Sequence, residues 1–80
     1  MQPEELTERI KRMVAEVTEL PADSLVMDAP LEGFGIDSLD VVKLAARFER
    51  AFGITITTEE LLRIKNLSDI VNEVGRKVAR

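Results

Sequence analysis

The chain has 80 residues, enough for one small domain with a single core, and 45% of them are hydrophobic. It contains no cysteine and no histidine, which excludes disulfides, a protein thiol and most zinc or transition-metal sites. The net charge of −4 and the scarcity of aromatic residues argue against nucleic-acid binding. No apolar run approaches the ~20 residues that span a bilayer, so we expect a cytoplasmic protein without membrane insertion.

The charge is unevenly distributed along the chain. Residues 1–40 carry ten acids and three bases, a net charge of −7, whereas residues 41–80 carry five acids and eight bases, a net charge of +3. Solvated surface charge is the ordinary explanation of such an imbalance, and a face suited to a charged partner is the alternative.

The first predicted helix begins at Pro3, a residue that the first turn tolerates, and Pro21 ends it. Glu4 and Glu5 complement the positive end of the helix dipole. Its apolar residues recur at helical spacing and predict one buried stripe: Leu6, Ile10, Met13, Val14 and Val17.

Residues 21–37 form a long predicted connection, because two prolines and two glycines oppose a regular helix there. Four apolar residues of this connection can still pack inward: Leu25, Met27, Leu31 and Phe34. A connection of this length without regular structure is uncommon in so small a domain, and it usually forms part of a functional site.

The second predicted helix begins at Asp37 or Ser38 with a capping-box-like arrangement that involves Asp40, and Gly53 ends it. Two apolar stripes run along it. The stripe predicted to be buried contains Val41, Leu44, Ala45, Phe48 and Phe52. The second contains Leu39, Val42 and Ala46, and a helix that is apolar on two faces is either central or shows one face to a partner.

The remaining residues predict an extended connection and two further helices. Residues 54–56 are β-branched at all three positions but have no second strand to pair with. A short third helix is predicted from Thr57 or Thr58 through Ile64, and a last helix from Asn66 or Ser68. Gly75 weakens that helix, so its last turn is expected to fray. The fold class is thus all-α, a four-helix bundle with a long first loop and a short third helix, in a single domain over residues 1–80.

Ser38 stands out because it lies at the start of a helix in a chain without histidine. A nucleophilic serine needs a neighbouring base, so a hydrolase or transferase built on Ser38 is disfavoured. Helix capping is the simplest reading of Ser38, but Asp37 can cap the helix alone. An anion attached to Ser38 would lie at a helix N-terminus, where the dipole favours it.

At these residues the chain resembles the acyl carrier protein family, four-helix domains that bind phosphopantetheine. The family's Asp-Ser-Leu signature is present as Asp37-Ser38-Leu39, followed by the acidic Asp40. The resemblance continues through the loop that closes at residues 33–36, the helix that ends at Phe52, and the apolar stripe of residues 67–74.

The resemblance implies that a separate phosphopantetheinyl transferase attaches 4′-phosphopantetheine from coenzyme A to Ser38. The arm supplies the thiol that the chain lacks, and thioester-linked acyl groups then travel between enzymes while the carrier itself catalyses nothing. The implied partners are acyl-transferring, condensing or ligase enzymes, and we expect a monomeric, discrete carrier.

The resemblance also implies the roles of two groups of residues. Partner recognition is expected from Asp37, Leu39, Asp40, Val42 and Ala46. An acyl pocket between the second and third helices would be lined by Phe48, Ile56, Leu61 and Ile64. Ordinary core packing is the alternative for Leu39, Val42 and Ala46. Leu62 either extends the partner surface or fills the core.

The chain departs from fatty-acid-type relatives in the charge of its second helix, which carries Lys43, Arg47 and Arg50 against Asp40 and Glu49. We therefore expect a specialised carrier of a fatty-acid, lipid or polyketide pathway, because wrong-sign charges exclude partners. An aminoacyl, peptidyl or D-alanyl carrier is one alternative, and an unmodified helical interaction domain is another.

Overall fold

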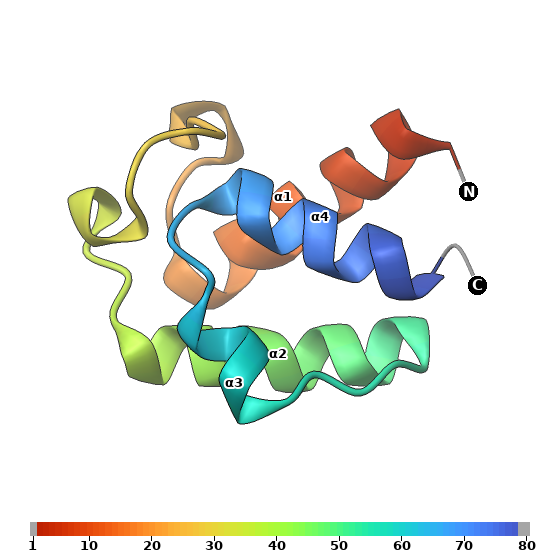
Figure 1. Ribbon diagram of the computed structural model, residues 1–80. Helices are drawn as coiled ribbons and strands as arrows, with labels where there is room; N and C mark the ends of the chain where they lie inside the picture. The colour runs from red at the N-terminus through yellow and green to blue at the C-terminus, as the bar shows by residue number, and fades with distance from the viewer. Residues whose placement is uncertain (1, 79–80) are drawn as a thin grey trace.

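The computed structural model describes residues 2–78, which form four α-helices and two short 3-10 helices. The α-helices are α1 (Pro3–Thr18), α2 (Ser38–Phe52), α3 (Thr58–Leu62) and α4 (Leu67–Val78), and the 3-10 helices η1 (Ala22–Ser24) and η2 (Leu31–Phe34) separate α1 from α2. In Figure 1, α1 and α4 cross on one side of the bundle, α2 forms the opposite side, and the short α3 lies across α2. The predicted fold class is confirmed.

Helix α1 ends at Thr18, three residues before the proline that was predicted to end it. Glu19 takes up a left-handed backbone conformation, with φ 60° and ψ 25°, and the chain turns away from the helix there. The predicted end of the helix at Pro21 was therefore wrong by three residues. A non-glycine residue in a left-handed conformation gives no clear signal in the sequence.

The connection between α1 and α2 is more ordered than the sequence predicted. Both η1 and η2 lie within it, and Gly35 closes η2 with a φ of 77°. Backbone hydrogen bonds tie it to the segment before α4 and to the first turn of α4: Leu31 N–H donates to Lys65 O at 3.0 Å, and Ser68 N–H donates to Met27 O at 3.0 Å. Leu25 and Leu31 are buried, as predicted to pack inward.

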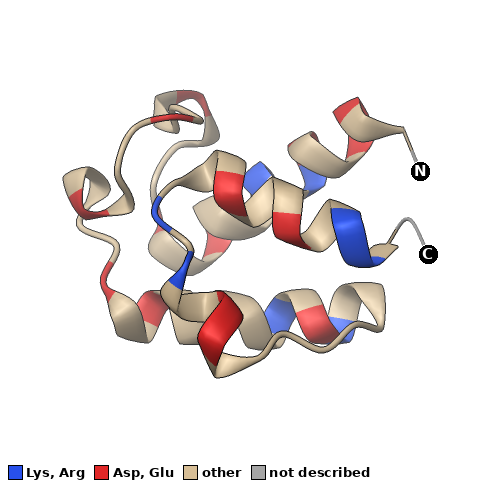
Figure 2. Cartoon of the chain, viewed as in Figure 1, with Lys and Arg blue, Asp and Glu red and all other residues tan. Residues whose placement is uncertain are grey.

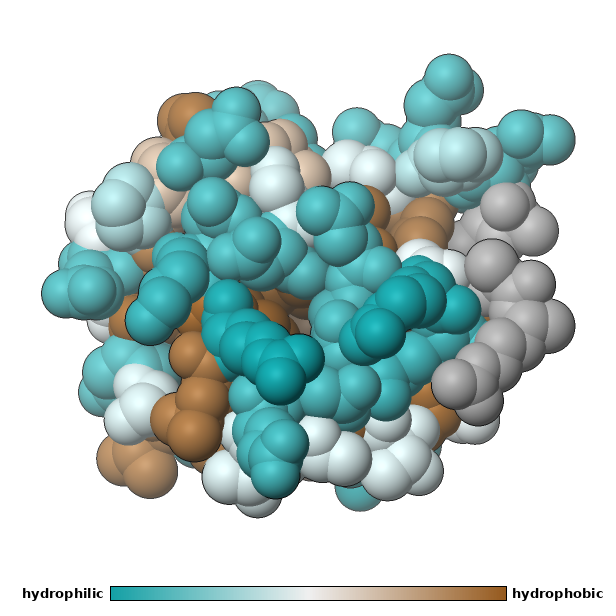
Figure 3. All heavy atoms as spheres, viewed as in Figure 1, coloured by the Kyte–Doolittle hydropathy of each residue, from teal (hydrophilic) through white to brown (hydrophobic). Residues whose placement is uncertain are grey.

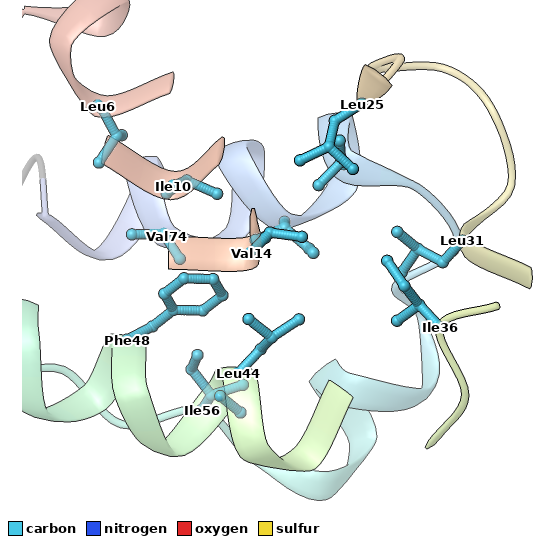
Figure 4. Packing of buried hydrophobic residues seen from close by; sticks show 13 residues of the cluster. Leu6, Ile10, Val14, Leu25, Leu31, Ile36, Leu44, Phe48, Ile56 and Val74 are labelled. Carbon is cyan, nitrogen blue, oxygen red and sulfur yellow. The ribbon is translucent and has the colours of Figure 1, made fainter. Parts of the chain in front are cut away.

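The core lies where α1, α2 and α4 meet, and its side chains point toward one another in Figure 4. The side chains with the least exposure come from all three helices: Ile10, Val14, Leu44, Leu67, Ile70 and Val74. Helix α3 contributes no fully buried residue, and it ends at Leu62 rather than at the predicted Ile64. Residues 54–56 are an extended connection, as predicted.

Gly75 marks a close approach of α4 to α1. A Cβ atom at this position would lie 3.3 Å from Leu6 Cδ2, tighter than ordinary van der Waals contact. The helix nevertheless continues through Gly75 to Val78, so no fraying is observed before that residue. Residues 79 and 80 lie outside the described residues.

Replacing Gly75 by alanine is expected to stabilise the protein by up to about 1 kcal/mol, the gain in helix propensity. The atom it would meet is the end of a flexible leucine side chain at the edge of the core, which can move by a few tenths of an ångström. Urea unfolding followed by circular dichroism measures the change. A loss of stability in Gly75→Ala would show that Leu6 is held in place by its neighbours.

Candidate functional site

Ser38 is exposed at the first position of α2, and its hydroxyl is not needed to cap the helix. Asp37 is the N-cap: Asp40 N–H donates to Asp37 Oδ1 at 3.0 Å, and Asp37 N–H donates to Asp40 Oδ2 at 3.2 Å. This reciprocal capping box confirms the predicted start of the helix. Within residues 2–78, no hydrogen bond involves the Ser38 hydroxyl, which leaves it available for chemistry.

An open hollow of about 530 Å³ adjoins Ser38, between η2, the first turns of α2, and α3. Val41 and Val42 line it from α2, and Thr58 and Lys65 line it from α3 and the segment that follows. The sequence does not predict Thr58 and Lys65 as part of this site, because only the packing of α3 against α2 brings them near Ser38. The hollow gives a flexible group on Ser38 a surface to lie along.

The second apolar stripe of α2 faces solvent, as predicted for a face shown to a partner. Leu39 is 69% exposed and Val42 54% exposed, and Ala46 is also exposed. Leu62 on α3 is 72% exposed, so its packing into the core is excluded. Brown atoms gather at the lower left of Figure 3, where α3 and the beginning of α2 lie in Figure 1. The role of this apolar surface in recognition stays a prediction.

Both acidic residues of α2 are engaged with backbone N–H groups. Asp40 belongs to the capping box, and Glu49 Oε2 accepts a hydrogen bond from Ile56 N–H at 2.8 Å. The three basic residues of the helix, Lys43, Arg47 and Arg50, are exposed. The fully exposed charged side chains of α2 are therefore all basic, while its two acids are partly buried.

The residues predicted to line an acyl pocket surround one small cavity between α2, α3 and α4. Phe48, Ile56, Leu61 and Ile64 all contribute to its lining. Its volume is about 10 Å³, at the lower limit of what one water molecule requires. The structure brings these four side chains together, and their role in holding an acyl chain stays a prediction.

Glu60 fastens α3 to the end of α4. Its carboxylate accepts hydrogen bonds from Lys77 Nζ and Thr57 N–H, each at 2.8 Å, and Arg76 Nη2 lies 3.4 Å away. Lys77 Nζ also donates to Thr55 O at 2.6 Å. The hydrogen bond from Lys77, followed by the one from Thr57 N–H, lowers the pKa of Glu60 from 4.5 to about 2.

This lowered pKa predicts a loss of stability in acid. Glu60 binds a proton more readily in the unfolded chain, so its contribution is complete above about pH 4.5 and disappears as the pH falls toward about 2. The free energy of unfolding of Glu60→Gln should therefore fall less steeply over this range than that of the unmodified chain. Urea unfolding at a series of pH values measures the slope.

Glu59→Gln is the matched control, because Glu59 is an exposed neighbour on the same helix. It should keep the acid-side slope of the unmodified chain. Identical slopes for the Glu60→Gln variant and the unmodified chain would mean that the hydrogen bond from Lys77 does not hold in solution.

Comparison with known proteins gives the class of this domain. The phosphopantetheine attachment site family matches residues 8–74, which include α2 with Ser38 and most of α1 and α4. None of the helices within residues 2–78 combines the length and the apolar composition that a membrane span requires. The class is therefore a helical phosphopantetheine-binding domain.

Individual relatives within this class are acyl carrier proteins. The chain is 34% identical over 79 residues to the acyl carrier protein of Petrotoga mobilis, covering 98% of this chain and 93% of the relative. It is 32% identical over 80 residues to the acyl carrier protein of Thermosynechococcus vestitus, covering 99% of each. The crystal structure of the Thermotoga maritima acyl carrier protein superposes with a TM-score of 0.85 at 24% identity, covering 99% of this chain and 93% of that one, and supports the fold.

The chain belongs to the acyl carrier protein family. Members are non-catalytic carriers that bear a phosphopantetheine arm, and membership implies a phosphopantetheinyl transferase and acyl-processing enzymes as partners. The predicted family and cofactor are confirmed.

Proposed function

We propose that Ser38 carries the 4′-phosphopantetheine arm and that the chain delivers acyl groups, bound to this arm as thioesters, to partner enzymes. The observation that carries the proposal is the capping of α2 by Asp37 and Asp40, which leaves the exposed Ser38 hydroxyl free. In the transfer, Ser38 Oγ loses its proton and forms the phosphodiester bond, while the nucleotide part of coenzyme A leaves.

The surroundings of Ser38 fit such a group. A phosphodiester there lies at the N-terminus of a 15-residue helix, whose dipole favours an anion by about 0.3–1 kcal/mol. The adjoining hollow of about 530 Å³ accommodates a flexible chain. The arm supplies a thiol to a polypeptide that has no cysteine.

The cargo belongs to a specialised fatty-acid, lipid or polyketide pathway, in which the carrier acts as a discrete, cytoplasmic monomer. The positive outward charge of α2 supports the specialised pathway, because enzymes adapted to acidic carriers meet repulsion there. Asp37-Ser38-Leu39 favours an acyl cargo over an aminoacyl or peptidyl one. Exposed Leu39, Val42 and Ala46, next to Asp37 and Asp40, form the partner-recognition surface.

The test is loading of the purified chain with coenzyme A and a promiscuous phosphopantetheinyl transferase, followed by intact-protein mass spectrometry. We expect the mass to increase by one phosphopantetheine group, and fragmentation to place it on Ser38. No increase would favour the unmodified interaction domain. A group on another residue would overturn the assignment of the site while leaving the carrier function in place.

A further inference from the structure

Two adjoining hollows between α1 and α2 are lined by basic side chains. The first, about 500 Å³, has arginines from both helices: Arg9 and Arg12 from α1, and Arg47 and Arg50 from α2. The second, about 410 Å³, shares Arg47 and Arg50 and adds Lys43. We call these five residues the basic face. Figure 2 shows basic segments on both helices.

The charge of this face opposes that of the rest of the chain. Glu16 is the only acid among the described residues that line the two hollows, so the five bases and this acid give +4. The whole chain has a charge of −4, which leaves −8 for all other residues. Glu16 lies 3.7 Å from Arg47, and both side chains are more than half exposed, so this pair neutralises the face weakly.

Arg9, one of the exposed arginines of the basic face, lies over an aromatic ring of α2. Its guanidinium carbon lies 4.7 Å from the centroid of the Phe52 ring, a cation–π arrangement at the end of α2. A guanidinium that is already oriented loses less conformational freedom on binding, and its planar donors match a carboxylate. The face is therefore suited to carboxylates that are themselves fixed in position.

The basic face lies next to the surface that surrounds Ser38. Lys43 and Arg47 follow Ser38 by about 7 and 14 Å along the axis of α2, at about 1.5 Å per residue. A protein that covers about 800 Å² of its partner makes a contact roughly 30 Å across. An enzyme that binds the Ser38-bound arm and covers the exposed stripe of α2 therefore comes within reach of Lys43 and Arg50, which follow Leu39 and Ala46 of that stripe by four residues each. Ala46, on the exposed apolar stripe, also lines the second hollow.

We infer that the enzymes that act on the Ser38-bound arm contact the basic face with an acidic protein surface, rich in aspartate and glutamate. The inference rests on the proposed function. An anionic membrane fits the molecule less well, because the rest of the chain carries −8 and the large exposed apolar residues, Val26, Leu39, Val42 and Leu62, line neither hollow. Nucleic acid fits less well because the chain has few aromatic residues for stacking.

A charge-swap experiment tests the inference. The loaded carrier is assayed with a condensing enzyme that has a basic docking surface, and with a variant of that enzyme in which those basic residues are changed to glutamate. We expect kcat/KM to be about 10–100-fold higher with the acidic enzyme at low salt, with the difference shrinking as salt is added. The carrier variant Arg47→Glu/Arg50→Glu should reverse the preference.

Lys11→Glu/Arg63→Glu is the matched carrier control, since it makes the same change in net charge at two residues that line neither hollow. It should keep the preference for the acidic enzyme. Equal kcat/KM values for the two enzymes, or a preference for the basic one, would overturn the inference. Failure of loading is read separately, from the mass of the carrier, and bears on the proposed function instead.

A second measurement needs no enzyme and uses the unloaded Ser38→Ala chain. Hexaglutamate peptide is added to the labelled chain, and amide shifts are followed by NMR. We expect shifts confined to α1 and α2 beside the basic face, abolished by Arg47→Glu/Arg50→Glu and kept in the control. Scattered shifts, or stronger binding to phosphatidylglycerol-containing vesicles than to the peptide, would contradict an acidic protein as the partner.

Discussion

Ser38→Ala is expected to abolish attachment of phosphopantetheine completely, because the substitution removes the oxygen that would form the phosphodiester bond. The fold should remain, since Asp37 and Asp40 cap α2 without the Ser38 hydroxyl. We expect the free energy of unfolding to change by no more than about 0.5 kcal/mol, the usual range for an exposed position. Loss of an N-cap residue costs about 0.5–2 kcal/mol by comparison.

Intact-protein mass spectrometry after incubation with coenzyme A and transferase measures the attachment, and urea unfolding measures the stability. Ser24→Ala is the matched control, an exposed serine in η1 whose hydroxyl donates to Pro21 O at 2.7 Å. This variant should be loaded like the unmodified chain. Loading of Ser38→Ala to the same extent would remove Ser38 from the proposed site.

Leu44→Ala is expected to have the largest effect on stability. Leu44 is 1% exposed and its side chain lies in the centre of the core in Figure 4. Truncating a buried leucine costs about 2–5 kcal/mol, because apolar contacts are lost and a cavity remains. A chain of this size has a total stability of roughly 4–12 kcal/mol, so the variant should lose a large share of it and unfold at a clearly lower urea concentration and temperature.

Leu62→Ala makes the same chemical change on the surface, where the side chain is 72% exposed. Its free energy of unfolding should stay within about 0.5 kcal/mol of the unmodified chain. Thermal and urea unfolding of the two variants compare the sites directly. A cost below about 1 kcal/mol for Leu44→Ala would mean that the core is packed less tightly than the structure shows.

Helix positions were predictable because their signals are local. Apolar residues at helical spacing located the buried side of α1, and the Asp37–Asp40 pair located the beginning of α2. The second apolar stripe of α2 was recognisable too, but the sequence left open whether it is buried or exposed, and the structure shows Leu39 and Val42 exposed. These features depend on residues a few positions apart.

Features that depend on distant residues were not predictable. From the sequence, Glu49 is expected to be an exposed charge, but its carboxylate accepts a hydrogen bond from Ile56 N–H, seven residues further along the chain. From the sequence, Gly75 is expected to weaken α4. The structure shows instead that Gly75 packs closely against Leu6 of α1, a helix at the other end of the chain. The basic face likewise combines α1 and α2, and only their packing brings its arginines together.

The nearly filled interior between α2 and α3 has a consequence for delivery. With about 10 Å³ free among Phe48, Ile56, Leu61 and Ile64, a hydrocarbon tail on the tether stays outside this cavity, at least partly in contact with water, while these helices keep their positions. Each methylene that moves from water into an apolar tunnel gains about 0.8 kcal/mol. The free energy gained on transfer to an enzyme therefore increases with the length of the tail. The carrier would release long tails most readily to an enzyme that has such a tunnel.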